Sequence, residues 1–173
     1  MPYKTFETER LLLRPTTVND SAFYLELLNT PKWLKYIGDR NVNTVNEAKS
    51  YIEGRILPQF KKLGFGNYTV VRKEDQVIIG SCGLYDREGL EGVDIGFAFL
   101  PKYEGLGYAY ESVSKLKQVA FDEFGILELS AITMEKNTSS RRLLENLGFK
   151  VIGPVRIPND EVELLLYSLV IGR

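Results

Sequence analysis

Residues 94–111 read DIGFAFLPKYEGLGYAYE, in which a strand pattern is followed by a glycine-containing turn and then by a helix pattern. Pro101 marks the end of the strand, because proline has no N–H group to donate to a sheet ladder. After Gly107, apolar residues recur at the spacing of one helix face, and Gly125 is placed to end that helix in a left-handed cap. The stretch therefore predicts a strand over residues 92–100 and, after a short turn, a long helix.

Gly105 and Gly107 stand where this helix should begin, and a helix N-terminus can bind a diphosphate. The first four N–H groups of a helix lack intrahelical partners, and the helix dipole adds partial positive charge there. Neither glycine has a Cβ atom that would keep phosphate oxygens away. A second Gly-x-Gly, at residues 64–66, follows a predicted helix and precedes a strand, so it does not present the free N–H groups of a helix N-terminus to a ligand. On this segment alone, an ordinary turn before a core helix stays an alternative.

The remaining periodicity predicts a strand, helices, three strands, then the helix just described, a strand, a helix and two strands. The predicted strands cover residues 10–14, 67–73, 77–86, 92–100, 127–134, 149–156 and 162–171. The predicted helices are one capped by Asn19 or Asp20, one that begins at the capping-box pattern Thr44–Glu47 and is kinked at Pro58, the glycine-flanked helix, and one over residues 138–147. The strands between residues 67 and 100 should form an antiparallel meander. No repeat or linker interrupts the pattern, so we expect one domain over residues 1–173.

Composition excludes several classes of function. The 173 residues include 22 basic and 23 acidic side chains, and a net charge of -1 gives no broad electrostatic surface for nucleic acid. No segment approaches the length of a membrane span, and the opening residues lack the apolar stretch of a signal peptide, so we expect neither a nucleic-acid nor a membrane partner and a cytoplasmic protein.

The sequence contains no histidine and a single cysteine, Cys82. Histidine-dependent triads, imidazole metal sites, cysteine zinc cages and internal disulfides are thereby excluded, and we expect no metal cofactor. Acid–base chemistry must fall to carboxylates, tyrosine, lysine, hydroxyls or water. Cys82 lies inside a predicted strand between Gly80 and Gly83, which favours a packed side chain over an attacking thiol.

The stretch 94–111, followed downstream by NTSS at residues 137–140 and LENLGF at residues 144–149, resembles the GNAT superfamily of N-acetyltransferases. The opening TERLLLRP at residues 8–15 is similar to the branch that contains the ribosomal-protein N-terminal alanine acetyltransferases. The resemblance implies an α/β (α+β) fold with a mixed, mostly antiparallel central sheet, helices on both faces, and a splayed gap beside the strand that ends at Leu100. It also implies acetyl-CoA as cosubstrate, with its pantetheine arm in the gap.

The resemblance further assigns residues to the cofactor. Main-chain groups of Phe97 and Phe99 would pair with the pantetheine amides as a partial extra strand. The family's phosphate pattern falls on Glu104, Gly107 and Ala109, but its first position is normally Gln or Arg. Because a carboxylate repels a pyrophosphate, we expect Glu104 to turn toward water. The full expected cofactor-binding set is Phe97, Phe99, Gly105, Leu106, Gly107, Tyr108, Ala109, Asn137 and Ser140.

Catalytic groups follow from the same resemblance. Asp94 is the candidate general base for the amine, although an exposed strand carboxylate is an equal alternative. Ser140 could protonate the departing thiolate, since the tyrosine acid of many relatives is replaced by Leu144. Asn137 would contact pantetheine, but asparagine is also a favourable N-cap residue. Glu111 lies close to the site, and its place in the first helical turn is explained by the helix dipole alone.

These residues favour direct transfer of an acetyl group to a primary amine, either a small molecule or the N-terminus of a protein. A non-catalytic acyl-CoA-binding module is the alternative, because Glu104 and Leu144 depart from the pattern of active relatives. A dinucleotide oxidoreductase is disfavoured, since Tyr110 occupies the third glycine position of the G-x-G-x-x-G pattern. A monomer and a homodimer both remain open.

Overall fold

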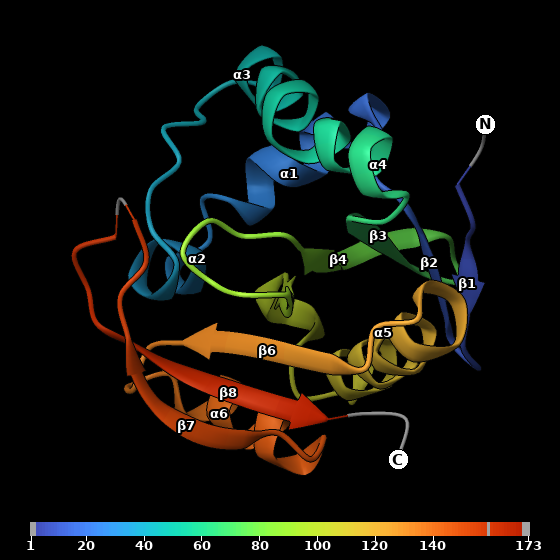
Figure 1. Ribbon diagram of the computed structural model, residues 1–173. Coiled ribbons are helices and arrows are strands. Elements are labelled where there is room, and N and C mark those ends of the chain that lie inside the picture. Colours follow the sequence, from blue (N-terminus) through green and yellow to red (C-terminus); the bar gives the residue numbers. More distant parts are fainter. Residues whose placement is uncertain (1–2, 159, 171–173) are drawn as a thin grey trace.

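The computed structural model describes residues 3–158 and 160–170 (Figure 1). Within these residues the strands form one sheet in the order β1-β2-β3-β4-β5-β6-β8-β7, in which only the β5–β6 pairing is parallel. The mixed, mostly antiparallel sheet and the antiparallel meander β3-β4-β5 are confirmed. The strands are β1 Phe6–Glu7, β2 Leu11–Pro15, β3 Asn67–Arg72, β4 Val77–Tyr85, β5 Val93–Phe99, β6 Glu128–Thr133, β7 Lys150–Val155 and β8 Leu164–Val170. The end of the last predicted strand, residue 171, lies outside the described residues.

Helices cover both faces of the sheet, as expected. Their bounds are α1 Ser21–Leu27, α2 Pro31–Tyr36, α3 Val45–Tyr51, α4 Leu57–Leu63, α5 Tyr108–Phe124 and α6 Thr138–Asn146. Neighbouring strand residues face opposite sides: Ile79 and Phe99 pack with the apolar face of α5, whereas Ile78 packs with the residues of α1 and α3. Figure 1 shows α1, α3 and α4 together above β3 and β4, with α6 beside β7 and β8. Two apolar cores therefore form, one on each face.

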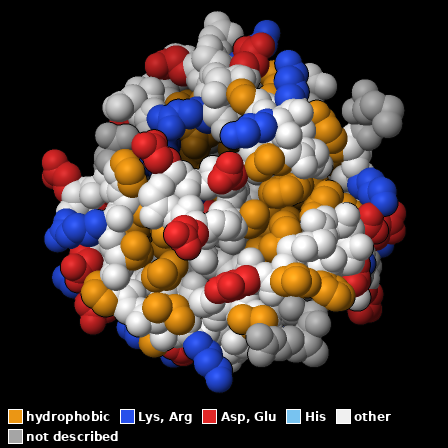
Figure 2. All heavy atoms as spheres, viewed as in Figure 1, with side chains coloured by type: hydrophobic (Ala, Val, Ile, Leu, Met, Phe, Trp, Pro, Cys, Tyr) orange, Lys and Arg blue, Asp and Glu red, His pale blue; other side chains and the backbone are white. Residues whose placement is uncertain are grey.

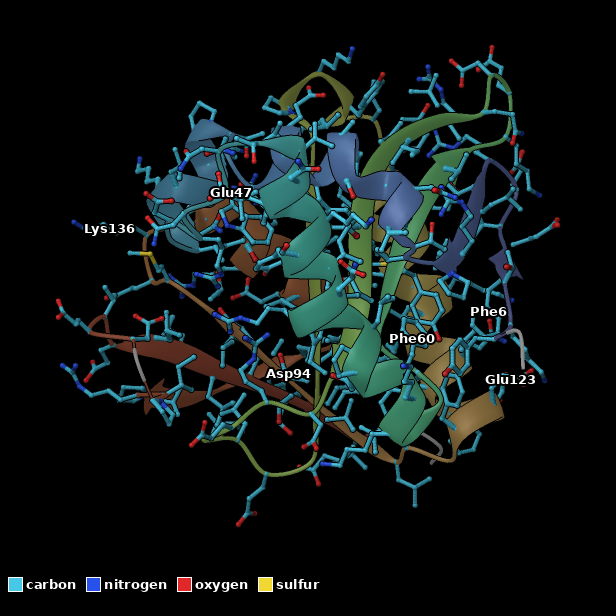
Figure 3. The ribbon with its side chains drawn as sticks, turned by 90° about the horizontal axis from the view of Figure 1, so that it is seen from above. Phe6, Glu47, Phe60, Asp94, Glu123 and Lys136 are labelled. Carbon is cyan, nitrogen blue, oxygen red and sulfur yellow. The ribbon has the colours of Figure 1, made fainter. Side chains whose placement is uncertain are left out.

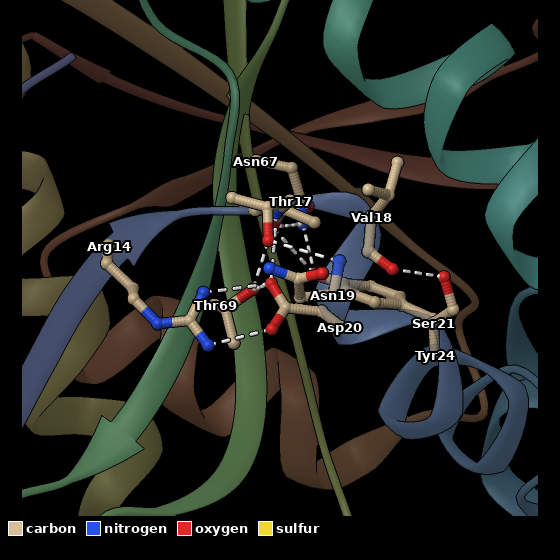
Figure 4. A network of polar contacts seen from close by, with 10 residues as sticks. Arg14, Thr17, Val18, Asn19, Asp20, Ser21, Tyr24, Asn67 and Thr69 are labelled. Carbon is tan, nitrogen blue, oxygen red and sulfur yellow. Dashed lines mark hydrogen bonds and ion pairs between the residues drawn. The ribbon is translucent and has the colours of Figure 1, made fainter. Parts of the chain in front are cut away.

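The first helix begins differently from the prediction. Thr17 caps a short 3-10 turn, Val18–Asp20, which precedes α1, and neither Asn19 nor Asp20 provides the side-chain cap. The Asp20 carboxylate is already occupied, because it accepts the Thr17 amide at 3.0 Å and two Arg14 donors at 2.9 and 2.7 Å (Figure 4). Burial acts to raise the pKa of Asp20, but the hydrogen bonds from Arg14, Thr17 and Thr69 outweigh it and lower that pKa.

The second predicted helix is divided into three parts. Thr44 caps α3 by accepting the Glu47 amide at 3.1 Å, and a π-helical segment, Ile52–Ile56, joins α3 to α4. Proline cannot donate the helical hydrogen bond of its position, so Pro58 produces a widened turn where a kink was predicted. The short elements β1 and α2 were not predicted; each is too brief to show a clear hydrophobic period.

Strand β5 separates from β6 soon after it begins. It pairs with β4 from Tyr85↔Asp94 to Gly80↔Phe99, which is all of β5 except its first residue. With β6 it pairs only at Val93↔Leu129 and Asp94↔Ser130. From Ile95 to Phe99, its second edge therefore has no strand partner in the described part of the chain. The sheet is open at this edge, beside the loop that leads into α5.

Candidate active site

The loop before α5 presents main-chain N–H groups that have no partner. Gly105 and Gly107 adopt left-handed φ values of 73° and 84°, which L side chains rarely tolerate. Gly107 is the N-cap of α5, and no side chain caps this end. The amides of residues 105–110 form no hydrogen bond with any described residue, and the first to reach a carbonyl is Glu111, which donates to Gly107 at 3.0 Å. An anion can take up these donors.

A first cavity, of about 290 Å³, lies against this loop and against the open edge of β5. Phe97 and Phe99 line it from the strand, and Gly105, Gly107 and Ala109 line it from the loop and the first turn of α5. The structure thus brings the predicted cofactor-binding residues together around one cavity. The exception is Leu106, whose side chain is not part of the lining and is half exposed.

Arg10 and Glu111 hold the loop from behind. The Glu111 carboxylate accepts the Arg10 Nε at 2.7 Å, the Arg10 amide at 3.0 Å and the Thr8 hydroxyl at 2.5 Å. Arg10 in turn donates to the Leu106 carbonyl at 3.1 Å, and its guanidinium lies 4.3 Å from the centre of the Tyr108 ring. We call Thr8, Arg10 and Glu111 the loop bracket. The sequence explained Glu111 by the helix dipole, but the hydrogen bonds of its carboxylate are to Thr8 and Arg10, just before β2.

Glu104 does not simply face water. The residue lines the first cavity, and its carboxylate forms an ion pair with Lys32 of α2. The lysine places a positive charge beside the carboxylate, which offsets the repulsion that a negatively charged ligand would otherwise meet. This pairing was missed because α2 itself was not predicted from the sequence.

Asn137 and Ser140 sit together at the start of α6. The Asn137 side chain caps the helix by accepting the Ser140 amide at 3.3 Å, so its capping role is present. Both residues also line the first cavity, and both line a second cavity next to it. Trp33 of α2 likewise lines both, and its indole N–H is buried without a hydrogen-bond partner among the residues that the structure describes. Nothing in the sequence pattern distinguished Trp33 from a core aromatic.

The second cavity, of about 420 Å³, opens on the other face of the sheet, toward α1 and α3. Asp94 lines it and is 1% exposed, so the alternative of an exposed strand carboxylate is wrong. Arg87 donates to both Asp94 oxygens at 3.1 to 3.2 Å. Burial raises the pKa of Asp94 above its ordinary value, and the Arg87 charge offsets part of that rise. Figure 3 shows Asp94 beside the loop that joins β4 and β5.

A buried polar network forms one wall of the second cavity. Tyr85 donates to the Asn67 carbonyl oxygen at 2.5 Å, and the Asn67 amide group reaches the Tyr24 hydroxyl. The network continues through Thr16 and Thr69 to Asp20 (Figure 4). Because each of these buried groups has a partner, the wall is rigid.

Leu144 and Cys82 are buried and take no part in proton transfer or nucleophilic attack. Leu144 is 1% exposed and packs in the core while touching the second cavity, and its side chain has no proton to donate. Cys82 is fully buried in β4, as predicted, and burial raises the pKa of its thiol far above the ordinary range. Among residues 3–158 and 160–170, no cluster of three or more metal-ligating side chains is present, and no helix is long and apolar enough to cross a membrane.

Comparison with known proteins gives a consistent result. The family model described as "Acetyltransferase (GNAT) domain" matches residues 10–150. The chain is 26% identical over 155 residues to the uncharacterized N-acetyltransferase YoaA of Bacillus subtilis. The aligned region covers 89% of this chain and 87% of that protein.

Two solved structures share the fold. The ribosomal-protein-S5-alanine acetyltransferase from Vibrio fischeri superposes with a TM-score of 0.80 at 19% identity, covering 96% of each chain. RimL, a ribosomal L7/L12 α-N-protein acetyltransferase solved with coenzyme A, superposes with a TM-score of 0.81 at 16% identity, covering 97% of this chain and 98% of its own.

Proposed function

The chain belongs to the GNAT family of acetyltransferases, which use acetyl-CoA, and from that premise we propose that it acetylates a primary amine by direct attack in a ternary complex. The single observation that carries the proposal is the open edge of β5 beside the unpartnered amides of residues 105–110. The N-terminus of a protein is one candidate acceptor, because structural neighbours of this chain act on ribosomal proteins.

The first cavity fits coenzyme A. The loop amides at the N-terminus of α5 can bind a diphosphate, and the absence of a Cβ atom at Gly105 and Gly107 leaves room for its oxygens. The free edge of β5 at Phe97 and Phe99 can pair with an amide-containing chain as a strand would. When bound, acetyl-CoA supplies an acetyl group activated as a thioester.

The acceptor amine must lose a proton before or during attack, and we assign that proton to Asp94. The net reaction forms a C–N bond and breaks a C–S bond, while the amine loses one proton and the thiolate gains one. Asp94 lines the second cavity next to Phe97 and Ala98, residues that line both cavities. Its raised pKa makes it a stronger base than an exposed aspartate, and Arg87 keeps the carboxylate oriented.

The Ser140 hydroxyl relays the proton for the departing thiolate: it donates a proton to the sulfur and regains one from water. Asp94 releases the amine proton to water, so both side chains return to their starting state. Ser140 lines both cavities from the first turn of α6, where its main chain is fixed by Asn137. Leu144 cannot supply the proton. Much of the rate enhancement then arises from holding the amine against the thioester carbonyl, with a main-chain N–H of β5 available to polarise the carbonyl oxygen.

The test combines binding and turnover. Titration calorimetry with coenzyme A should show binding, and release of free thiol should be followed with acetyl-CoA and a panel of amines and N-terminal peptides. Binding with turnover supports the proposal, whereas binding without turnover on any amine indicates the non-catalytic module. Ser140→Ala should lower kcat with little change in KM for acetyl-CoA, while Thr138→Ala, a neighbouring exposed hydroxyl that lines neither cavity, should match the parent. Equal kcat for Ser140→Ala and the parent would remove Ser140 from the mechanism.

A further inference from the structure

The second cavity contains two arginines whose charge is not used by the protein. Arg40, which follows α2, and Arg55, in the π-helical segment, both line this cavity and not the first. Neither forms an ion pair or a hydrogen bond with another described residue. The Arg40 guanidinium lies 6.0 Å from the centre of the Trp33 ring, which places it near the residue that borders both cavities.

Two of the three carboxylates that line the cavity already have a basic partner. Asp94 pairs with Arg87, and Asp86 lies 3.8 Å from Lys62, which is outside the cavity lining. Asp160 accepts the Val162 amide at 3.0 Å. The lining holds three arginines and three aspartates and so has no net charge, but its charges are not all paired. Arg40 and Arg55 have no ion-pair partner among the described residues, and Asp160 is the one lining carboxylate without a basic partner there. Figure 2 shows this side of the molecule, where a hollow lies beneath α1 and α3 and both basic and acidic side chains lie around it.

Two unpaired arginines are unexpected in a cavity that receives an amine. A protonated amine would be repelled by free guanidinium groups, so a simple alkylamine gains nothing from them. Guanidinium groups pair best with carboxylate or phosphate oxygens, which match their planar, forked donors. An acceptor that carries such a group beside its amine would be attracted to the cavity and fixed in orientation.

We propose that the acceptor is an amine that also bears a carboxylate or a phosphate, and that Arg40 and Arg55 bind this anionic group in the second cavity. The inference rests on the proposed function, and it assigns an acceptor class to the same site. Arg55 of the π-helical segment is exposed and lines the cavity from its rim, while Arg40 lines it from the loop after α2. The amine end then points toward Asp94 and the boundary with the first cavity.

The experiment measures kcat/KM for thiol release with matched amine pairs that differ in one anionic group. One pair is the dipeptide amides Glu-Ala-NH2 and Gln-Ala-NH2, whose α-amino groups are closely similar, and the second is O-phosphoethanolamine and ethanolamine. We expect the anionic member to be preferred by about tenfold or more at low salt, as charge-assisted hydrogen bonds predict. The preference should fall as salt is raised. Comparing the two pairs distinguishes a peptide acceptor from a small phosphorylated one.

The double variant Arg40→Gln/Arg55→Gln should lose this preference by slowing only the anionic member. Coenzyme A affinity should stay unchanged, because neither arginine lines the first cavity. Lys49→Gln, which removes an exposed charge from α3 and lines neither cavity, serves as the matched control and should keep the preference. Equal rates within both pairs, or an equal loss for charged and neutral amines in the double variant, would overturn the inference while leaving acetyl transfer intact. No thiol release with any amine would overturn the proposed function as well.

Discussion

Replacing Glu111 by glutamine should weaken cofactor binding without affecting chemistry. All three partners of the Glu111 carboxylate are donors in the native arrangement: the Thr8 hydroxyl, the Arg10 amide and the Arg10 Nε. The glutamine amide has the same shape but carries two N–H groups on one side. In either orientation of the amide, at least one Arg10 donor meets another donor, and the loop bracket loses its hold.

The magnitude can be estimated from exposure. The Glu111 side chain is 20% exposed and that of Arg10 is 42% exposed, so the loss lies between an exposed ion pair and a buried charge-assisted bond. The free energy of unfolding should fall by about 1–2 kcal/mol. For a chain of this size, Tm should fall by about 2–8 °C. Freeing Arg10 also releases the Leu106 carbonyl and the Tyr108 ring, which should raise KM for acetyl-CoA by about two- to fivefold.

The assay compares thermal unfolding with initial rates at saturating amine. Glu123→Gln, on the same helix but paired with Lys4 far from the loop, is the control and should leave KM unchanged. Hydrogen bonds from Thr8 and Arg10 overcome the effect of burial and lower the pKa of Glu111, so its stabilisation is present above the unfolded pKa and is lost as pH falls through the folded value. The Tm difference between parent and variant should therefore shrink in acid. A lower Tm with unchanged KM would show that the loop bracket is structural only.

Three further results are expected. Asp94→Asn should lower kcat with little change in KM for acetyl-CoA, and it should remove the acidic limb of the pH–rate profile. In the parent that limb should lie above the ordinary aspartate pKa, because Asp94 becomes a base only as pH rises through its raised pKa. An unchanged limb in the variant would exclude Asp94 as the base. Gly107→Val should unfold more readily than the parent, because φ is 84° at this position. Asparagine tolerates a left-handed φ, so Gly107→Asn should fold but should raise KM for acetyl-CoA. A normal KM in the folded Asn variant would contradict the placement of the diphosphate. Cys82 should stay unreactive toward a thiol reagent in the native protein, so a rapid reaction would contradict its burial.

Long periodic elements could be predicted from the sequence, because their apolar spacing reports directly on burial. The helix over residues 108–124 ends at Gly125 with a left-handed φ of 65°, as predicted. Short elements could not be predicted, since α2 has only six residues and no buried stripe. That omission removed Lys32 from the predicted site.

The partners of the site side chains could not be predicted either, because they depend on contacts between segments that are distant in sequence. Asp94 was predicted to act in the site, but its pairing with Arg87 arises only when the loop between β4 and β5 folds back. The strain that a substitution at Gly107 would cause was also not predicted, because it depends on the backbone conformation and not on the residue pattern. The left-handed φ of Gly107 strains any β-branched residue, whether or not a ligand is bound.

The separation of β5 from β6 explains how an enzyme without histidine can carry out this transfer. The gap exposes main-chain groups of one strand to a cavity on the α5 face, while Asp94 on the same strand borders a cavity on the α1 face. Two ligands can therefore approach the same short segment from opposite sides and react directly. No side chain needs to carry the acetyl group, which agrees with the burial of Cys82, the one thiol in the sequence. The remaining demands are to orient two ligands and move two protons, and carboxylate, hydroxyl and main-chain groups are sufficient for both.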